Sequence, residues 1–456
     1  MIWVIVITIL FLIMFAVVRW AKGGSTSTVF NFKRDVKQAE KENPKQENIQ
    51  EDKTLLGKNT MKKDVFISNK AKHIFVCGTT GSGKTVALSN FIASGNEHDY
   101  PMLIIDGKGD VGRDTLLDIT TKMSANRKVY VVDLNNPQTS DRYNPFQNTG
   151  ADIIKDMLIN MSNWTEEHYK FNTERYIQRL ANLLELSDIK VSLATLTKYI
   201  PVDAFKKLSK DLETKKLISK EEHTANLALA KASGEIAEGA AARFATIKES
   251  RLGQIFHEDG IDIYTALKEN AIILFILNPL LYPEMSPLIG KLIIIDSKKA
   301  ISLFYQNERK KRIFYLLDEI NVYASTGMLD LVNKSRSANI TCVLATQSLS
   351  DLAMAHSEAF KEQILENCNN YILLRQNCSA NAEYWANMFG TKQTLSATYQ
   401  IKGSDDSVES TELGSLRRTR EFIYHPDEIK KLSMGNAIYM SRDTNFHTKV
   451  NIHKPF

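Results

Sequence analysis

The sequence predicts an α/β protein whose core is interrupted by an inserted all-α domain and preceded by one N-terminal transmembrane helix. Short apolar runs separated by turns, a long stretch with helical spacing between two of these runs, and an apolar N-terminus predict this arrangement. The chain has 456 residues, 43% of them hydrophobic and 24% charged, enough for more than one folded unit. Its formal charge of +5 fits a polyanionic partner without identifying one.

The N-terminal apolar run extends from Ile2 to Val18 and is interrupted only by Thr8. At about 1.5 Å per residue, a helix of this length just reaches across a bilayer. No charge precedes the run, and Arg19 and Lys22 follow it, which argues against a cleaved signal peptide and places the following residues in the cytoplasm. We therefore expect residues 1–21 to be a single-pass anchor in the cell membrane. The alternative is a buried N-terminal helix.

Residues 22–63 are rich in charged and amide side chains, so we expect a charged linker. The apolar runs that follow are typical of strands in a parallel sheet covered on both faces. They read HIFVC, MLIID, KVYVVD, AIILFIL, RIFYLLDE, TCVLATQ and YILLRQ. Between the third and fourth runs, residues 151–254 carry apolar side chains at three- and four-residue spacing, which predicts the all-α insertion. Residues 64–150 and 255–456 would form the two parts of a nucleotide-binding core.

A glycine-rich motif, CGTTGSGKT, ends the first apolar run. Its glycine and GKT spacing is that of a P-loop, and an apolar, helix-like segment follows it as that motif requires. Backbone N–H groups of such a loop surround phosphate oxygens, Lys84 reaches the outer phosphates and Thr85 binds Mg²⁺. The predicted nucleotide-binding residues are Gly78, Thr79, Thr80, Gly81, Ser82, Gly83, Lys84 and Thr85.

Paired acids follow the apolar run RIFYLL. Asp318 is expected to hold the magnesium shell, and Glu319 to orient and deprotonate an attacking water. The alternative is a structural pair with a lysine. Gln347, at the tip of the next strand, would sense the outer phosphate or position the water; alternatively it only caps the strand. Together these motifs predict an ATPase that uses ATP and Mg²⁺.

The motif set excludes several classes of P-loop protein. No N-K-x-D sequence is present, which argues against a GTPase, and no LSGGQ-like element indicates a transporter cassette. A RecA-like P-loop NTPase acting as a motor remains. Such rings complete the site with an arginine from the neighbouring subunit; Arg336 and Arg375 are the candidates, and either could instead be an ordinary ion-pair residue. Asp106 and Lys108 are expected near the nucleotide or in a simple turn.

The order of the motifs resembles that of the TraG/TraD-type coupling ATPases of conjugation and type IV secretion systems. The stretches that carry the resemblance are GTTGSGKT, IIDGKGD, RYNPF, YLLDEI, KSRSANITCVLATQSL, ILENCNNYILLR and HPDEIKKLSMGNAIYM. The resemblance implies a hexamer on the inner membrane and an all-α domain that meets the DNA-processing complex. By position it assigns Lys84 and Thr85 to nucleotide and magnesium, Asp318 and Glu319 to the Walker B pair, and Gln347 to the strand tip. Members often have two membrane helices, whereas this sequence predicts one.

The expected function is a membrane-anchored ATPase that couples hydrolysis to the transfer of DNA, or a relaxase–DNA complex, to a type IV secretion channel. The implied partners are DNA, relaxosome proteins, channel components, the membrane and further copies of the chain. No base-reading element is visible, so DNA contacts would go to the backbone, independently of sequence. The basic stretch containing Arg243, Lys248 and Arg251 could face DNA or solvent. The alternatives are an FtsK/HerA-like DNA pump and a nucleotide-regulated membrane docking platform.

Overall fold

The computed structural model describes residues 52–70, 73–124, 126–161, 166–306, 311–404 and 407–456. The predicted anchor and most of the predicted linker therefore lie outside the described residues. Within the described ranges, no helix is both long enough and apolar enough to span a membrane.

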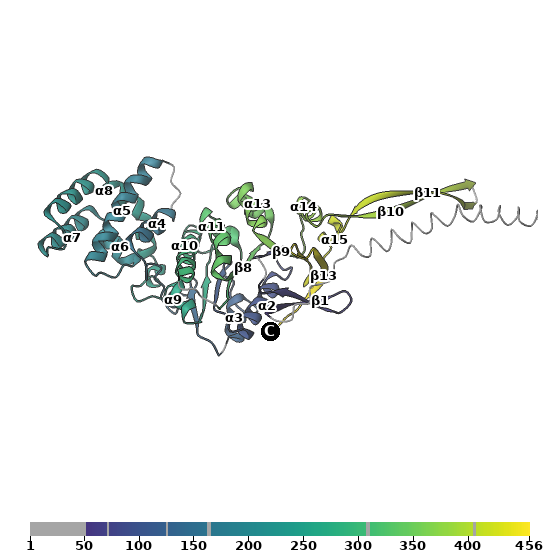
Figure 1. Ribbon diagram of the computed structural model, residues 1–456, viewed down its shortest axis with the longest axis horizontal. Helices are drawn as coiled ribbons and strands as arrows, with labels where there is room; N and C mark the ends of the chain where they lie inside the picture. The colour runs from purple at the N-terminus through teal and green to yellow at the C-terminus, as the bar shows by residue number, and fades with distance from the viewer. Residues whose placement is uncertain (1–51, 71–72, 125, 162–165, 307–310, 405–406) are drawn as a thin grey trace, which may run out of the picture.

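A mixed sheet of eleven strands forms the core (Figure 1), in the order β2-β1-β13-β12-β9-β3-β8-β7-β4-β6-β5. The strands are β1 Lys53–Asn59, β2 Asp64–Ser68, β3 His73–Cys77, β4 Met102–Asp106, β5 Val129–Asp133, β6 Ile272–Ile276, β7 Ile313–Leu317, β8 Ile340–Thr346, β9 Cys368–Leu373, β12 Asn436–Ser441 and β13 Phe446–Ile452. Strands β9 to β5 in that order pair in parallel, and the other four join them antiparallel. The predicted apolar runs all form parallel strands.

Helices cover both faces of this sheet, which explains why its central strands are apolar throughout. Along β3, Phe75 points into one layer and Ile74 and Val76 into the other, because successive side chains of a strand alternate. One layer contains α2 Lys84–Glu97 and α3 Leu116–Met123. The other contains α9 Ile263–Lys268, α10 Met285–Gln306, α11 Thr326–Ser335, α12 Leu349–Ala355, α13 Glu358–Glu366, α14 Ser379–Phe389 and α15 Pro426–Lys430.

The structure corrects two expectations. The sheet is mixed, not parallel, because β1, β2, β12 and β13 extend it on one side. β1 also lies inside the range predicted to be a linker, which is therefore too long at its C-terminal end. Its sequence, KTLLGKN, mixes buried, partly exposed and exposed residues and contains no continuous apolar run. β1 lies between β2 and β13, and pairing with these two neighbours stabilises it more than its own composition does.

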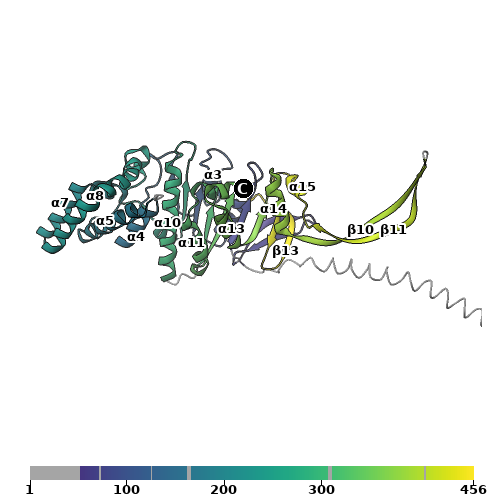
Figure 2. The ribbon, with the colours of Figure 1, turned by 90° about the horizontal axis from the view of Figure 1, so that it is seen from above.

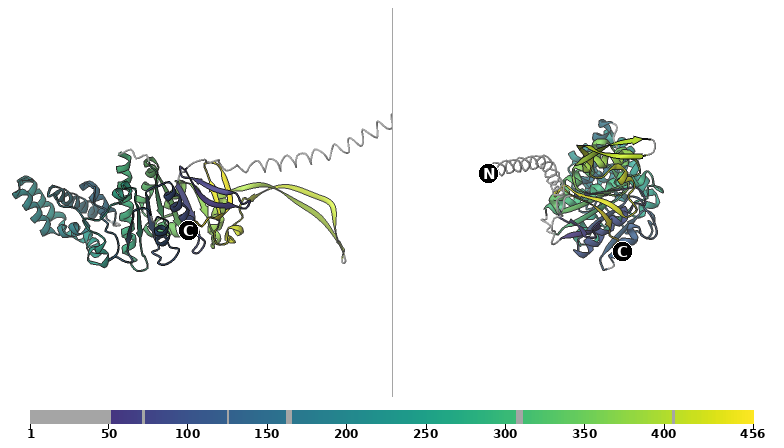
Figure 3. Two further views of the ribbon diagram at one scale, coloured as in Figure 1. Left: turned by 90° about the horizontal axis from the view of Figure 1, so that it is seen from below. Right: turned by 90° about the vertical axis from the view of Figure 1, so that its right-hand side faces the viewer.

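A long two-stranded hairpin, β10 Thr391–Ser404 and β11 Ser407–Phe422, was not predicted. It projects from the core at the end opposite the helical insertion (Figure 1, Figure 2 and the left view of Figure 3). Its sequence is mostly polar, so it lacks the apolar run by which the other strands were found.

The insertion occupies the opposite end of the molecule (Figure 1). It comprises α4 Ala151–Asn160, α5 Glu167–Leu186, α6 Leu193–Tyr199, α7 Val202–Thr214, α8 Lys220–Glu249 and the 3₁₀ turn η1 Arg251–Gln254. These elements fill the range for which an all-α domain is predicted. Tyr176 of α5 stacks on Phe205 of α7 with ring centroids 4.6 Å apart. The apolar faces of the helices thus pack on one another.

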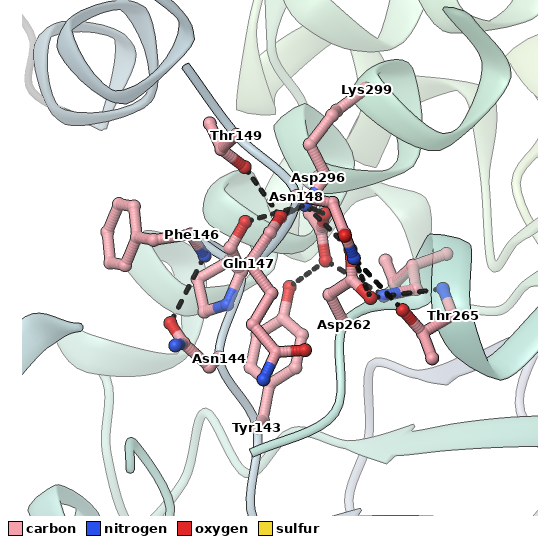
Figure 4. A network of polar contacts seen from close by, with 12 residues as sticks. Tyr143, Asn144, Phe146, Gln147, Asn148, Thr149, Asp262, Thr265, Asp296 and Lys299 are labelled. Carbon is pink, nitrogen blue, oxygen red and sulfur yellow. Dashed lines mark hydrogen bonds and ion pairs between the residues drawn. The ribbon is translucent and has the colours of Figure 1, made fainter. Parts of the chain in front are cut away.

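A buried polar network joins the insertion to the core (Figure 4). Lys299 of α10 lies 2.8 Å from Asp296 and 2.9 Å from Asp262, and all three side chains are at most 1% exposed. The hydroxyl of Tyr143, in the segment that leads into the insertion, donates to Asp296 Oδ2 at 2.8 Å. Lys299 also donates to the carbonyl of Gln147 at 2.7 Å. The segment before the insertion and the segment after it are therefore both bonded to side chains of α10.

Candidate nucleotide site

The glycine-rich loop connects β3 to α2 in a conformation that requires its glycines. Gly81 and Gly83 have φ of 72° and 111°, in the left-handed region that favours glycine. A Cβ atom on Gly78 would lie 2.5 Å from Leu374 Cβ and 2.7 Å from Ser82 Oγ. The loop is thus closely packed at Gly78. It ends at the N-terminus of α2, where free backbone N–H groups can bind phosphate.

Lys84, the first residue of α2, is only 3% exposed. Its ammonium donates to the carbonyl of Gly78 at 2.7 Å and lies 4.0 Å from Glu319 Oε2. Burial lowers the pKa of Lys84, while the Glu319 charge opposes that shift. The side chain therefore lies inside the loop, where an outer phosphate would meet it.

Strand order brings the other predicted residues to the same edge. β8 lies between β3 and β7, so the residue after β8 adjoins the loop. The hydroxyl of Thr80 donates to Gln347 Oε1 at 3.1 Å. Asp318 and Glu319 directly follow β7. Glu319 has φ of 51°, and its N–H donates to Asp318 Oδ1 at 3.0 Å.

Three carboxylates gather beneath the loop: Asp106, Asp318 and Glu319 are 3%, 2% and 4% exposed. Burial and the charge of Asp318 raise the pKa of Glu319 to about 7, against the opposing charges of Lys84 and Lys108. Burial and Asp318 likewise raise the pKa of Asp106 to about 7. Among the described residues, Glu319 Oε2 is buried without a hydrogen-bond partner. A buried carboxylate oxygen without a partner points to a ligand that supplies one.

A cleft of about 270 Å³ adjoins one of these acids, Asp106. Its walls are formed by Thr85, Asp106, Lys108, Asp110, Val111, Arg113, Asp114, Thr115 and Leu116. Hydroxyl and carboxylate oxygens are the ligands that Mg²⁺ prefers. Together with the glycine-lined loop and the unpaired oxygen of Glu319, the residues present fit a magnesium nucleotide.

The two candidate arginines lie at opposite edges of the sheet. Arg375 follows β9, and its carbonyl accepts the N–H of Thr79 at 3.0 Å, so it adjoins the loop of its own chain. Its Nε is buried with no hydrogen-bond partner in the described ranges. Arg336 is exposed in the 3₁₀ turn η3, Arg336–Ala338, before β8. β8 spans about 23 Å at 3.3 Å per residue, so the structure does not bring Arg336 to its own nucleotide loop.

The basic stretch expected to meet DNA lies in the insertion, away from the nucleotide site. Lys248 is partly buried near the end of α8, and Arg251 is exposed in η1. The side chain of Arg243 lies outside the described residues. The stretch is therefore separate from the edge of the sheet that carries the glycine-rich loop.

One contact to the loop was missed by sequence reasoning. The N–H of Gly435, in the turn before β12, donates to the carbonyl of Ser82 at 3.0 Å. A Cβ atom on Gly83 would lie 3.3 Å from the Gly435 nitrogen. The glycine in SMGNA was the only signal in the sequence, and one glycine does not reveal its partner.

Comparisons with known proteins agree with this geometry. Residues 312–434 match the family described as the TraM recognition site of TraD and TraG, and residues 35–110 match the FtsK/SpoIIIE family. An uncharacterized protein of Mycoplasma pneumoniae is 28% identical over 109 residues, which are 24% of this chain and 72% of that protein.

Three solved structures share the fold. The bacterial conjugative coupling protein TrwBdeltaN70 has a TM-score of 0.61 at 16% identity, over 90% of each chain. TrwB in complex with ADP and Mg²⁺ has a TM-score of 0.57 at 17% identity, over 85% of this chain and 86% of that one. VirB4 of Thermoanaerobacter pseudethanolicus has a TM-score of 0.54 at 10% identity, over 88% and 96%. The family match over residues 312–434 confirms the resemblance of this chain to the TraG/TraD-type coupling ATPases, and the three structures show a shared fold.

Proposed function

We propose that the chain is a membrane-anchored, hexameric ATPase that couples ATP hydrolysis to the transfer of DNA, or a relaxase–DNA complex, to a type IV secretion channel. The observation that carries the proposal is the convergence of Lys84 and Glu319. A P-loop lysine and a buried acid with an unpaired oxygen lie 4.0 Å apart at one edge of the sheet. This pairing suits both phosphate binding and water activation.

Each residue of the site has a proposed task. The N–H groups of the glycine-rich loop and the Lys84 ammonium bind the phosphates. Thr85 and Asp318 would hold Mg²⁺, which when bound offsets the charge of the phosphate oxygens. Glu319 orients the attacking water and accepts its proton on Oε2. Gln347, whose side chain accepts a hydrogen bond from Thr80, would respond to the outer phosphate.

A ring would supply the remaining charge. Arg336 is exposed and remote from its own nucleotide loop, so it suits a role in a neighbouring subunit's site. Arg375 adjoins its own loop, and its partly buried guanidinium is the second candidate. An arginine placed in this way stabilises charge on the transferred phosphoryl group.

The proposed partners follow from the family match and the sequence. The match to the TraM recognition site of TraD and TraG favours a relaxosome protein as a partner of residues 312–434. DNA would be held through its phosphates, with Lys248 and Arg251 as candidate contacts. Residues 1–21 would anchor the chain in the cell membrane, with residues 64–456 on the cytoplasmic side.

ATP turnover of the full chain in detergent tests the proposal. Lys84→Ala removes the phosphate-binding charge and is expected to abolish nucleotide binding. Glu319→Gln keeps the shape but not the base; it is expected to bind ATP and hydrolyse it at least about 100-fold more slowly. Equal turnover by wild type and Glu319→Gln would contradict the proposed ATPase and favour a docking platform.

The match of residues 35–110 to the FtsK/SpoIIIE family favours one second candidate, an FtsK/HerA-like DNA pump. The two functions differ in cargo. A coupling protein is expected to bind a relaxase–DNA complex more tightly than the same naked DNA, whereas a pump is expected to bind both equally.

A further inference from the structure

The loop after β4 has a backbone fixed from both sides. A Cβ atom on Gly107 would lie 2.8 Å from the carbonyl oxygen of Asp318, and one on Gly109 would lie 2.0 Å from that of Leu277. Gly109 also has φ of 69°, which favours glycine. Asp106 Oδ1 accepts the N–H groups of residues 108 and 109 at 2.9 and 3.2 Å. The loop is therefore held between the ends of β7 and β6, so the backbone that carries Lys108 has little freedom.

The side chain of Lys108 extends from this loop to the buried acid. Its ammonium lies 4.0 Å from Glu319 Oε2, the same oxygen that lies 4.0 Å from the Lys84 ammonium. In the described part of the chain this oxygen accepts no hydrogen bond. Lys108 is 21% exposed and lines the cleft together with Thr85. Two lysines from different elements thus converge on one carboxylate oxygen.

The two lysines are not equivalent. Lys84 belongs to the P-loop, where the lysine is engaged by the outer phosphates. Lys108 belongs to a loop that packs directly on the backbone of Asp318 and Glu319. Glu319 itself has a left-handed backbone, a conformation that persists in a non-glycine residue only where its surroundings enforce it.

We propose that Lys108 is a positioning residue for Glu319: its ammonium holds the carboxylate in place while Lys84 is engaged with phosphate. The inference rests on the proposed function, because it assigns the attacking water to Glu319. Attraction between opposite charges is stronger in this buried setting than at the surface, where water and salt screen it. Gly107 gives the loop its close approach to the end of β7, and Gly109 its close approach to the end of β6.

The main competing role for Lys108 is direct contact with a nucleotide phosphate, because the side chain also lines the cleft. The two roles predict different kinetics. A phosphate ligand contributes to ATP affinity whatever residue stands at position 319. A positioning residue contributes to turnover, and only while Glu319 is present.

The experiment measures kcat, KM and the Kd of a fluorescent ATP analogue for the full chain in detergent. Lys108→Met is expected to lower kcat about tenfold, with KM and Kd changed by less than about twofold. Lys108→Arg retains the charge and is expected to restore most of the loss. The matched control is Lys58→Met: Lys58 also lies 4.0 Å from a carboxylate, that of Asp64, but at 66% and 49% exposure. It is expected to change nothing.

A double-mutant cycle completes the test. In a Glu319→Gln background, Lys108→Met is expected to cause no further loss of kcat, because the residue it positions is already removed. Weaker ATP binding, additive losses or an unchanged kcat in Lys108→Met would each overturn the inference. A wild-type chain that hydrolyses no ATP overturns the proposed function as well, whereas an active wild type with an unaffected Lys108→Met overturns the inference alone. Thermal unfolding midpoints of the variants show whether each one is folded.

Discussion

At the scale of the residue, burial decides what the polar side chains of the central strands do. Glu319 and His73 lie near opposite edges of the sheet, and neither is more than 4% exposed. Burial raises the pKa of the Glu319 carboxyl to about 7 and lowers that of the His73 imidazole to about 4. In both cases the charged form is the one that burial disfavours. The acid lies at the proposed nucleotide site, whereas the histidine has a structural role.

His73 begins β3 and joins it to its surroundings as a neutral ring. Nδ1 accepts the N–H of Cys342 at 3.1 Å, so Nε2 carries the proton and donates to the carbonyl of Val332 at 2.8 Å. Protonation of Nδ1 would break the first of these bonds. The charge of nearby Arg336 further disfavours the cationic ring.

We therefore predict acid-sensitive stability through His73. Its folded pKa is about 4, below the unfolded value of about 6.5. The folded state thus binds fewer protons, so the contribution is complete above pH 6.5 and is lost as the pH falls toward 4, at a cost of about 2–3 kcal/mol. Thermal unfolding of wild type and His73→Gln from pH 4 to 8 measures it. The wild type is expected to lose more stability on acidification than the variant, and the exposed control His453→Gln is expected to follow the wild type.

At the scale of the element, the insertion depends on a charge network that no single helix contains. Asp262 caps α9, Asp296 and Lys299 belong to α10, and Tyr143 lies before the insertion. Burial raises the pKa of Asp296 to about 6, and the charge of Lys299 opposes that shift. The Lys299 ammonium forms ion pairs with both buried carboxylates and also donates hydrogen bonds to backbone carbonyls of the segment that leads into the insertion. Removing one partner would leave the others buried and unpaired.

Lys299→Met is predicted to destabilise the protein strongly. Breaking a buried ion pair by removing one partner costs about 3–5 kcal/mol. The neighbouring Lys298 supplies the control, since its ammonium also lies 2.8 Å from a carboxylate, that of Asp330, at 37% and 61% exposure. Lys298→Met is expected to cost less than about 1 kcal/mol. Denaturant unfolding measures both variants, and equal losses would show that burial of the network contributes nothing.

At the scale of the whole molecule, the insertion and the β10–β11 hairpin occupy opposite ends of the sheet, with the nucleotide site between them (Figure 1). The exposed Arg336 and the loop-bound Arg375 lie at different edges of that sheet. A single chain therefore does not bring both arginines to its nucleotide loop. We therefore predict that one of the two arginines acts in the site of a neighbouring subunit.

We accordingly predict that ATPase activity per subunit rises with protein concentration and rises further when DNA is added. The stimulation by DNA is expected to fall steeply as the salt concentration increases. Arg336→Ala, or else Arg375→Ala, is expected to retain ATP binding and lose this dependence. Inactive Lys84→Ala subunits retain both arginines and are expected to restore part of the activity when mixed with the arginine variant. Titration of the mixed subunits at fixed DNA measures the effect. A flat response that survives both arginine substitutions would contradict the ring.

The sequence by itself determined the parallel strands, the phosphate loop and the helical insertion, because each has a local signal. A buried strand needs a continuous apolar run, a P-loop needs glycines at fixed spacing, and an amphipathic helix needs its 3.6-residue period. The distance between Lys84 and Glu319 has no such signal. It depends on the placement of β8 between β3 and β7, a pairing of segments far apart in the chain.

Only the tertiary structure decided the remaining features. β1 is partly polar, and its pairing with β2 and β13 keeps it in the sheet. The β10–β11 hairpin has no apolar run in its sequence. Lys108 reads as part of a glycine-rich turn, and its contact with Glu319 exists because β4 and β7 are neighbours. Nothing in the sequence distinguishes Asp262 and Lys299 from other charged residues. Their ion pair is expected to matter for stability because both side chains are buried. Long-range packing sets both distance and burial, which is why neither could be predicted from local pattern.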